Sequence, residues 1–222
     1  MLITSIQDDI KKRLPNFKIG MITYQGIVVD HSPQMLRGRL QFFQEEIKVN
    51  LETTPLTSLA GIKEWREIFK TLGIDPTRYR PSSEALYQRI KKGQSLPLIN
   101  SAVDLNNFFS LQHEIPLGIY DLDQLQGPVE YRIGQEEDQF LGINGRVNQL
   151  KNKLISADAD GPFGSPIVDS KRTIVTEKTK NALHIVYLKE SMQPSEANKL
   201  LSSLASMFTQ VHGGEATPSL IT

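Results

Sequence analysis

The hydrophobic period of this sequence changes near Pro116, and that change constrains the fold more than any other feature. Before Pro116, apolar residues and helix-capping signals predict helices over 6–14, 32–49, 61–71, 82–92 and from 101 onward. After it, short β-branched and aromatic runs separated by turn residues predict strands within 115–122, 127–133, 140–144 and 182–188. A last amphipathic stretch predicts a helix over 195–210. Helices and strands that are grouped apart in this way indicate an α+β fold.

The N-terminal part adds a strand or hairpin over 17–30, on which the helix over 32–49 is expected to pack. Serine residues precede three of the predicted helices. We expect caps at Ser32, at Ser82 or Ser83, and at Ser101, where Asp104 completes the pattern of a capping box.

Composition excludes several classes of function. The 222-residue chain has no cysteine, so disulfides, thiolate catalysis and Cys-ligated metal sites are excluded, and a reducing compartment is slightly favoured. Lys+Arg and Asp+Glu are both 25, which gives no global positive field for DNA or membrane surfaces. No apolar run approaches the roughly 20 residues that cross a bilayer. We expect a cytoplasmic protein without membrane or DNA partners, whose oligomeric state the sequence leaves open.

Motifs for independent chemistry are absent. The sequence has no phosphate-binding glycine loop, dinucleotide fingerprint, HExxH zinc motif or GxSxG elbow, and we expect no cofactor. Asp158 and Asp160 before Gly161 hint at a calcium loop, but the acidic residues and the glycine do not match that template together, so no metal is expected. The four histidines lie far apart, and only His212, before two glycines, is a weak candidate for a mobile functional residue.

Two segments hold candidate functional side chains. A basic segment is a candidate for phosphate binding, with the alternative that it is only a solvated helix face; its residues are Arg78, Arg80, Arg89, Lys91 and Lys92. In the following predicted helix, the polar residues Asp104, Asn106 and Asn107 interrupt an apolar pattern. Their side chains can orient a water molecule or a substrate carbonyl, or can satisfy buried backbone groups.

The second segment resembles a known family. The pattern is Val103-Asp104 with Asn107, then Pro116, then Tyr120-Asp121-Leu122-Asp123 with Leu125, Gly127 and Arg132. It is similar to the B3/B4 module of the phenylalanyl-tRNA synthetase beta chain, without gaps from about Arg89 to Gly145. Freestanding proteins with this module also share the features Trp65-Arg66, D-P-x-R-x-R-P-S-S-E-A-L over 75–86 and L-P-x-I-N over 96–100.

The resemblance implies a layered β/β/α fold with an N-terminal α/β extension. It also implies one domain over 1–222, with an N-terminal lobe at 1–60 packed on a best-matching core at 61–212. The glycine-rich segment 213–222 is expected to be a flexible tail. A pocket is expected between the helix that carries Asn107, the strand over 116–121 and the loop over 161–170.

In the synthetase this pocket hydrolyses tRNA that carries the wrong amino acid. The resemblance implies that Asn107 orients the substrate and that Asp169 replaces the family's pocket glutamate, where it holds the substrate amino group or a water molecule. The residues implied in substrate binding are Asp104, Asn106, Leu117, Gly118, Gly161, Phe163 and Ser170. Gly118 replaces the family's pocket histidine, which removes one polar contact.

Two classes of function follow from the residues and the resemblance. The first is a hydrolase that deacylates mischarged tRNA in trans by positioning water at the activated ester, which needs no nucleophilic side chain. The second is a non-catalytic module that binds tRNA, another RNA or a protein. A hydrolase of small amino-acid derivatives would use the same pocket without phosphate contacts.

Overall fold

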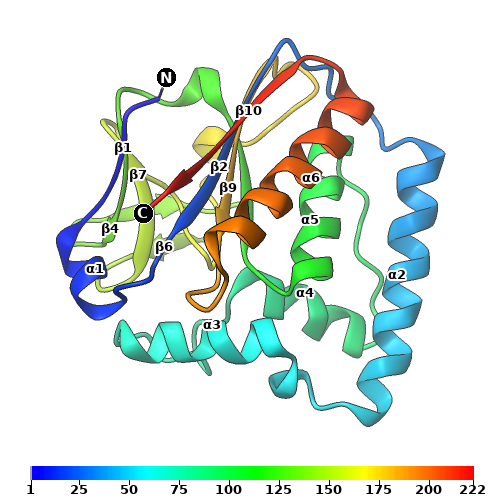
Figure 1. Ribbon diagram of the computed structural model, residues 1–222, viewed down its shortest axis with the longest axis horizontal. Helices are drawn as coiled ribbons and strands as arrows, with labels where there is room; N and C mark the ends of the chain where they lie inside the picture. The colour runs from blue at the N-terminus through cyan, green and yellow to red at the C-terminus, as the bar shows by residue number, and fades with distance from the viewer. Residues whose placement is uncertain (1) are drawn as a thin grey trace.

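The computed structural model describes residues 2–222, which form three layers (Figure 1). The first layer is a sheet with the strand order β1-β4-β7-β8, and the second is a sheet with the order β10-β2-β9-β3. Helices α5 and α6 cover the outer face of the second sheet, where α6 contacts β2 and β10 and α5 contacts β3. The predicted α+β fold with β/β/α layers is confirmed.

The strands of the second sheet are all antiparallel, whereas β1 is parallel to β4 in the first sheet. A small sheet, β5 with β6, completes the strand structure. The bounds are β1 Thr4–Ile6, β2 Ile19–Gln25, β3 Leu117–Asp121, β4 Val129–Ile133, β5 Gln139–Leu141, β6 Val147–Gln149, β7 Leu154–Asp158, β8 Gly161–Gly164, β9 Asn181–Tyr187 and β10 Glu215–Ile221.

The helices follow the predicted order, with some different ends. Their bounds are α1 Asp8–Arg13, α2 Gln34–Thr53, α3 Ala60–Thr71, α4 Ser82–Lys91, α5 Ser101–His113 and α6 Pro194–His212, and short 3-10 turns lie at η1 Leu56–Ser58, η2 Leu122–Gln124 and η3 Lys171–Thr173. The cap predicted at Ser101 is wrong by one residue. Asn100 is the cap, because its side-chain oxygen accepts a hydrogen bond from the Val103 amide at 3.0 Å. The caps of α2 and α4 are Pro33 and Pro81, without the predicted serine hydrogen bonds.

Segments near both ends of the chain form strands of the two sheets. Strand β2 lies between β10 and β9, so residues 1–60 supply an inner strand of the second sheet, and the predicted division of the single domain stays a prediction. The tail predicted to be flexible instead forms β10, which pairs with β2 from Glu215 to Ile221. This correction has a physical reason, since the open edge of β2 offers the tail a full ladder of backbone hydrogen bonds.

The inner face of the helical layer holds an aromatic and histidine cluster. Phe208 of α6 stacks on Tyr24 and on His212, each with a ring-centroid distance of 4.0 Å. The Tyr24 hydroxyl lies 3.1 Å from Nδ1 of His184, and both side chains are fully buried. The suggestion that His212 is mobile is wrong, because its ring nitrogens lie 2.8 Å from the Phe208 carbonyl oxygen and 2.9 Å from Ser101 Oγ. We call Tyr24, His184, Phe208 and His212 the histidine cluster.

No helix within residues 2–222 is both long enough and apolar enough to cross a membrane.

Candidate functional site

The candidate site lies between the two sheets, where Tyr120 fills a space left by two glycines. Gly118 and Tyr120 are two residues apart on β3 and therefore share a face of the strand. A Cβ atom added to Gly118 would lie 2.1 Å from the Tyr120 hydroxyl, and one added to Gly164 of β8 would lie 2.2 Å from it. The tyrosine ring end thus occupies the position where the side chain of residue 118 would point. No side chain fits at either glycine unless Tyr120 moves.

Asp169 meets this tyrosine from the loop that follows β8. The Tyr120 hydroxyl donates a hydrogen bond to Asp169 Oδ1 at 2.6 Å. The loop is held at both sides of the aspartate, since the Ile143 amide donates to the Asp169 carbonyl and the Ser170 amide donates to the Phe163 carbonyl, both at 2.9 Å. Phe163 packs edge to face on Tyr120 with a centroid distance of 4.9 Å. The position of the carboxyl is therefore fixed by backbone contacts.

The electrostatics of this pair differ from those of exposed side chains. Burial raises the pKa of Asp169 to about 7, although the hydrogen bond from Tyr120 lowers it. Burial, and then the nearby Asp169 carboxylate, hold the pKa of Tyr120 well above its usual value. Near neutral pH, Tyr120 keeps its proton while Asp169 exchanges between its two forms. Asp169 as a residue is half-buried in the loop, although its carboxyl group is desolvated enough to raise the pKa.

Further hydroxyl groups lie in the same layer. The Tyr187 hydroxyl and Ser156 Oγ are 2.8 Å apart, and both residues are fully buried. The Tyr131 hydroxyl is buried without a hydrogen-bond partner among the described residues. Tyr187 lies in the strand predicted over 182–188, but no sequence motif connects it with the site. Only the pairing of β9 with β3 and the packing of the two sheets bring it close.

The polar residues at the start of α5 are arranged differently from the prediction. Asp104 is buried, and its two carboxylate oxygens accept from Ser32 Oγ at 2.5 Å and from the Ile99 amide at 2.9 Å. Those bonds connect the start of α5 to the segment before α2. Asp104 therefore follows the second alternative, in which the polar side chains satisfy nearby groups of the protein. Asn106 is buried with its side-chain oxygen unpaired within residues 2–222. Asn107 is partly exposed, and no hydrogen bond joins it to Asp169 in the described chain.

The other predicted substrate contacts divide into two groups. Gly118 and Phe163 lie against Tyr120, as described above. Leu117 instead pairs with Val186 on the face that points to the helices. Gly161 lies at the tip of the β7–β8 hairpin, and Ser170 Oγ accepts a hydrogen bond from the Arg172 amide at the start of η3. These last contacts are structural, and substrate binding by any of the set stays a prediction.

The basic segment is split by the fold. All five predicted residues are exposed, but only Arg80 and Lys91 line a cavity of about 310 Å³ beside α4. Arg66 also lines this cavity and pairs with the buried Glu84 at 2.8 Å. The complete lining is Pro55, Leu56, Thr57, Arg66, Thr77, Arg80, Glu84, Gln88 and Lys91.

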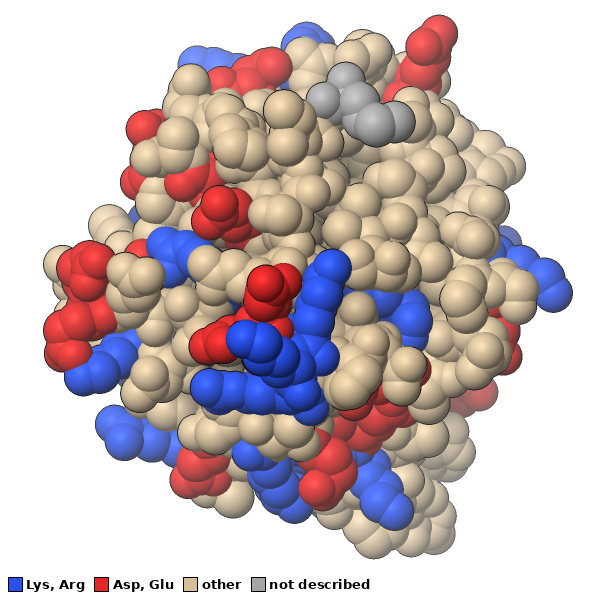
Figure 2. Space-filling model, turned by 60° about the vertical axis from the view of Figure 1, so that its left-hand side comes forward, with Lys and Arg blue, Asp and Glu red and all other residues tan. Residues whose placement is uncertain are grey.

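The remaining three cations lie elsewhere: Arg78 is placed over the Tyr79 ring at 5.1 Å, Arg89 donates to the Ser95 carbonyl at 3.2 Å, and Lys92 ends α4. Basic and acidic side chains are interleaved on the face shown in Figure 2, in agreement with their equal numbers. Only Arg80 and Lys91 of the five cations therefore share a cavity, and phosphate binding by any of the five stays a prediction.

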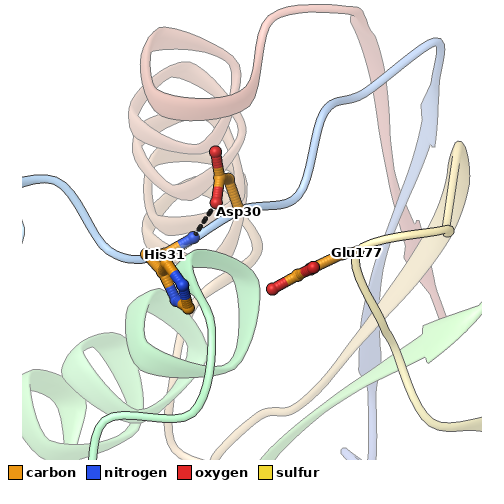
Figure 3. Close-up of side chains that lie close together, drawn as sticks. All are labelled: Asp30, His31 and Glu177. Atoms are coloured by element: carbon orange, nitrogen blue, oxygen red, sulfur yellow. Dashed lines mark hydrogen bonds between the residues drawn. The ribbon is translucent and has the colours of Figure 1, made fainter.

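Two groups of acidic residues resemble metal ligands. Asp158 accepts two hydrogen bonds from the Arg172 guanidinium, at 2.7 and 3.1 Å, so this carboxylate is already neutralised. Asp30, His31 and Glu177 are exposed and present ligand atoms within 4.8 Å of one another (Figure 3). The Ser101 amide at the start of α5 donates to the Asp30 carbonyl at 2.8 Å, so these side chains lie near a helix end whose dipole repels cations.

Comparisons with known proteins agree on one family. The model of the B3/4 domain matches residues 64–210. An uncharacterized protein of Bacillus subtilis, YhzB, is 33% identical over 96% of both chains. The phenylalanine–tRNA ligase beta subunits of Bartonella quintana and Xylella fastidiosa Temecula1 are 27% and 26% identical over 64% and 77% of this chain, which spans 17% and 22% of their length. A solved N-terminal fragment of the Pyrococcus horikoshii phenylalanyl-tRNA synthetase beta subunit is 14% identical, with a TM-score of 0.49, over 96% of this chain and 50% of the fragment.

Proposed function

The chain belongs to the B3/4 domain family, and from that premise we propose that it hydrolyses mischarged aminoacyl-tRNA in trans, in the cytoplasm. The observation that carries this proposal is the pair formed by Asp169 and Tyr120. A half-buried carboxyl with a pKa of about 7 matches the requirement for a general base at neutral pH. The histidine cluster, by contrast, offers no group with access to a substrate.

The proposed step is an ester hydrolysis. The ionised Asp169 accepts a proton from a water molecule, whose oxygen attacks the carbonyl carbon of the aminoacyl ester. The bond from that carbon to the terminal ribose oxygen then breaks, and the ribose oxygen takes the proton back from Asp169, which gives free tRNA and amino acid and restores the carboxylate. An aminoacyl ester is already activated, so a positioned water and a base suffice without a covalent intermediate. Tyr120 keeps the carboxyl oriented through its hydrogen bond.

Asn107 is proposed to orient the substrate, because it is partly exposed and its amide forms no hydrogen bond among the described residues. Arg80 and Lys91 are proposed to contact tRNA phosphates, since both are exposed and line one cavity.

The position of Gly118 also bears on the amino acid that is edited. With the Tyr120 ring end beside it, residue 118 provides no polar side chain to recognise a substrate hydroxyl.

One observation favours a second candidate, a module that binds tRNA without catalysis. The ring end of Tyr120 fills the space beside Gly118, so the pocket has less room at the position where the family carries a histidine. Binding would then depend on the basic cavity, and the Asp169–Tyr120 hydrogen bond would serve stability alone.

The test is the deacylation of a panel of mischarged tRNAs by the unaltered chain, Asp169→Asn, Asn107→Ala and Tyr120→Phe. Buffer without protein corrects for spontaneous hydrolysis of the ester. We expect rapid hydrolysis of a few species, with kcat/KM rising as the pH approaches 7, and loss of activity in Asp169→Asn. If all tRNAs stay charged while a filter-binding assay detects binding, the non-catalytic module is correct. If neither hydrolysis nor binding occurs, both proposals fail.

A further inference from the structure

Helix α2 carries an apolar stripe that faces away from the rest of the molecule. Met35, Phe42 and Val49 are seven residues apart, which brings them onto one side of the helix at intervals of about 10 Å. Their exposed fractions are 56%, 73% and 63%, respectively. The buried residues of α2, Leu36, Leu40, Ile47 and Leu51, occupy its opposite side. Helix α2 packs with that side on α4 and α5 and forms the outer edge of the molecule (Figure 1).

Charged residues flank this stripe in a symmetric arrangement. Arg39 lies three residues before Phe42 and Glu45 three residues after it, on opposite sides of the stripe at 100° per residue. Gly38 and Glu46 are likewise four residues before and after Phe42. All four residues are exposed, and the charged ones form no ion pair within residues 2–222.

We propose that this face of α2 binds the same face of a second copy of the chain, with the two helices antiparallel about a twofold axis at Phe42. The axis places Phe42 against its own copy and Met35 against Val49 of the second copy. The axis keeps each flank of the stripe on the same side of the interface. It therefore places Arg39 beside Glu46 of the second copy, since both lie on one flank, and each dimer gains this pair twice. On the other flank, Gly38 lies beside Glu45 of the second copy and leaves room for that longer side chain.

The groove beside α2 supports the same arrangement. A cavity of about 590 Å³ is lined by Arg37, Gly38 and Glu45 of α2 together with Leu96 and Leu98. The groove lies on the Gly38 and Glu45 flank of α2, so the twofold axis directs Glu45 of the second copy toward it, where Arg37 has the opposite charge. Leu98 is 53% exposed at its rim and becomes covered. An interface of this kind joins an apolar centre to a charged border.

The symmetry identifies the partner as a second copy. In a twofold interface each residue must suit its counterpart at the mirrored position, and the arginine–glutamate pair and the glycine–glutamate pair both meet this condition. A parallel pairing would instead place Glu46 beside Glu45 of the second copy and Arg39 beside Gly38. Like charges would then meet at two positions, so charge complementarity favours the antiparallel arrangement alone.

Cross-linking tests the arrangement directly, because the chain has no cysteine of its own. Phe42→Cys is expected to form a disulfide-linked dimer on mild oxidation. Met35→Cys and Val49→Cys are expected to remain monomers separately and to cross-link when mixed. Val28→Cys, an exposed apolar position outside α2, is the control and should not cross-link. Self-cross-linking of Met35→Cys, or no cross-link in any α2 variant, would overturn the proposal.

Charge exchange gives an independent test by light scattering over a concentration series. We expect the unaltered chain to reach twice its mass of 25.0 kDa. Arg39→Glu and Glu46→Arg should each weaken self-association at least tenfold, while an equal mixture of the two variants should dimerise. The mixture restores opposite charges at both pairs, which only an antiparallel contact of these residues achieves. The proposal would be contradicted if the unaltered chain stays a monomer at all concentrations. It would also be contradicted if the mixture associates no more tightly than each variant alone.

Discussion

The sheet β10-β2-β9-β3 buries a polar and aromatic cluster on each of its faces, and the two clusters differ in access to water. On the face toward the helices, the histidine cluster is closed, and its members contact one another, the backbone of α6 or Ser101 of α5. On the face toward the first sheet, Tyr120 contacts Asp169, whose side chain is half-buried at the end of a loop. Different elements supply the two clusters: β2, β9 and α6 carry the histidine cluster, whereas β3 and the loop after β8 carry Tyr120 and Asp169.

The pKa shifts of the two clusters have the same cause and opposite directions. Burial, followed by the neighbouring His212, lowers the pKa of His184 to about 3, so this histidine is neutral under ordinary conditions. Burial raises the pKa of Asp169 to about 7, within the range where a base can work. A fully enclosed group that never titrates near neutral pH serves packing. A titrating group at an accessible edge can also serve chemistry.

The largest expected effect is on hydrolysis. Asp169→Asn should lower kcat by about 10²–10⁴-fold, the usual contribution of a general base, because the amide cannot accept the proton. His184→Asn on the opposite face should leave kcat per folded molecule within about twofold. Single-turnover deacylation measures both, with circular dichroism as the check of folding. Equal losses in the two variants would remove the functional distinction between the faces.

Glycine substitutions on the two faces should separate stability from activity. Gly118→Ala places a Cβ atom against the Tyr120 hydroxyl and should displace the tyrosine from Asp169. Overpacking of this kind costs about 1–3 kcal/mol, and activity should fall with it. Gly20→Ala faces Leu201 at 2.5 Å on the helical side, so it should destabilise the chain without lowering kcat. Urea unfolding and deacylation rates, measured on both variants, provide the comparison.

The pH dependence of stability should have opposite signs for the two faces. His184 has a folded-state pKa below its unfolded value. Its contribution to the free energy of unfolding is therefore present above about pH 6.5 and is lost as the pH falls toward 3. Asp169 has a folded-state pKa above its unfolded value of about 3.9, so its contribution is present below that pH and is lost as the pH rises to about 7.

Thermal unfolding from pH 4 to pH 8 measures these slopes. The stability of Asp169→Asn relative to the unaltered chain should increase with pH up to about 7, by about 2 kcal/mol after allowance for solvent screening, or about 4–8 °C in Tm. The stability that His184→Asn loses relative to the unaltered chain should become smaller as the pH falls below 6.5. Parallel curves for the two variants and the unaltered chain would show that neither shift exists.

The smallest expected effect concerns the basic cavity. Arg80→Gln and Lys91→Gln should each weaken tRNA binding a fewfold and reduce the slope of log affinity against log salt by about one. Lys12→Gln, an exposed cation on α1, is the matched control and should change neither quantity. Filter binding at several salt concentrations makes the measurement, and an equal effect of all three substitutions would indicate non-specific attraction.

The sequence by itself determined the order of most helices and strands and the family motif around Asn107 and Tyr120. Helical and strand periods are local properties, so α3 and α6 could be predicted from their apolar spacing. The short strand β7 and the C-terminal strand β10 were missed, because neither alternates clearly, and each forms through pairing with a distant segment.

Only the tertiary structure decided which polar residues meet. The sequence named Asp169 and Gly118 but could not pair them with the Tyr120 hydroxyl, since that contact depends on how the two sheets pack. It also grouped five cations that the fold separates, because neighbours along a helix turn to different sides. Local propensity is encoded over a few residues, whereas the burial that raises the pKa of Asp169 arises from segments about 50 residues apart in the chain.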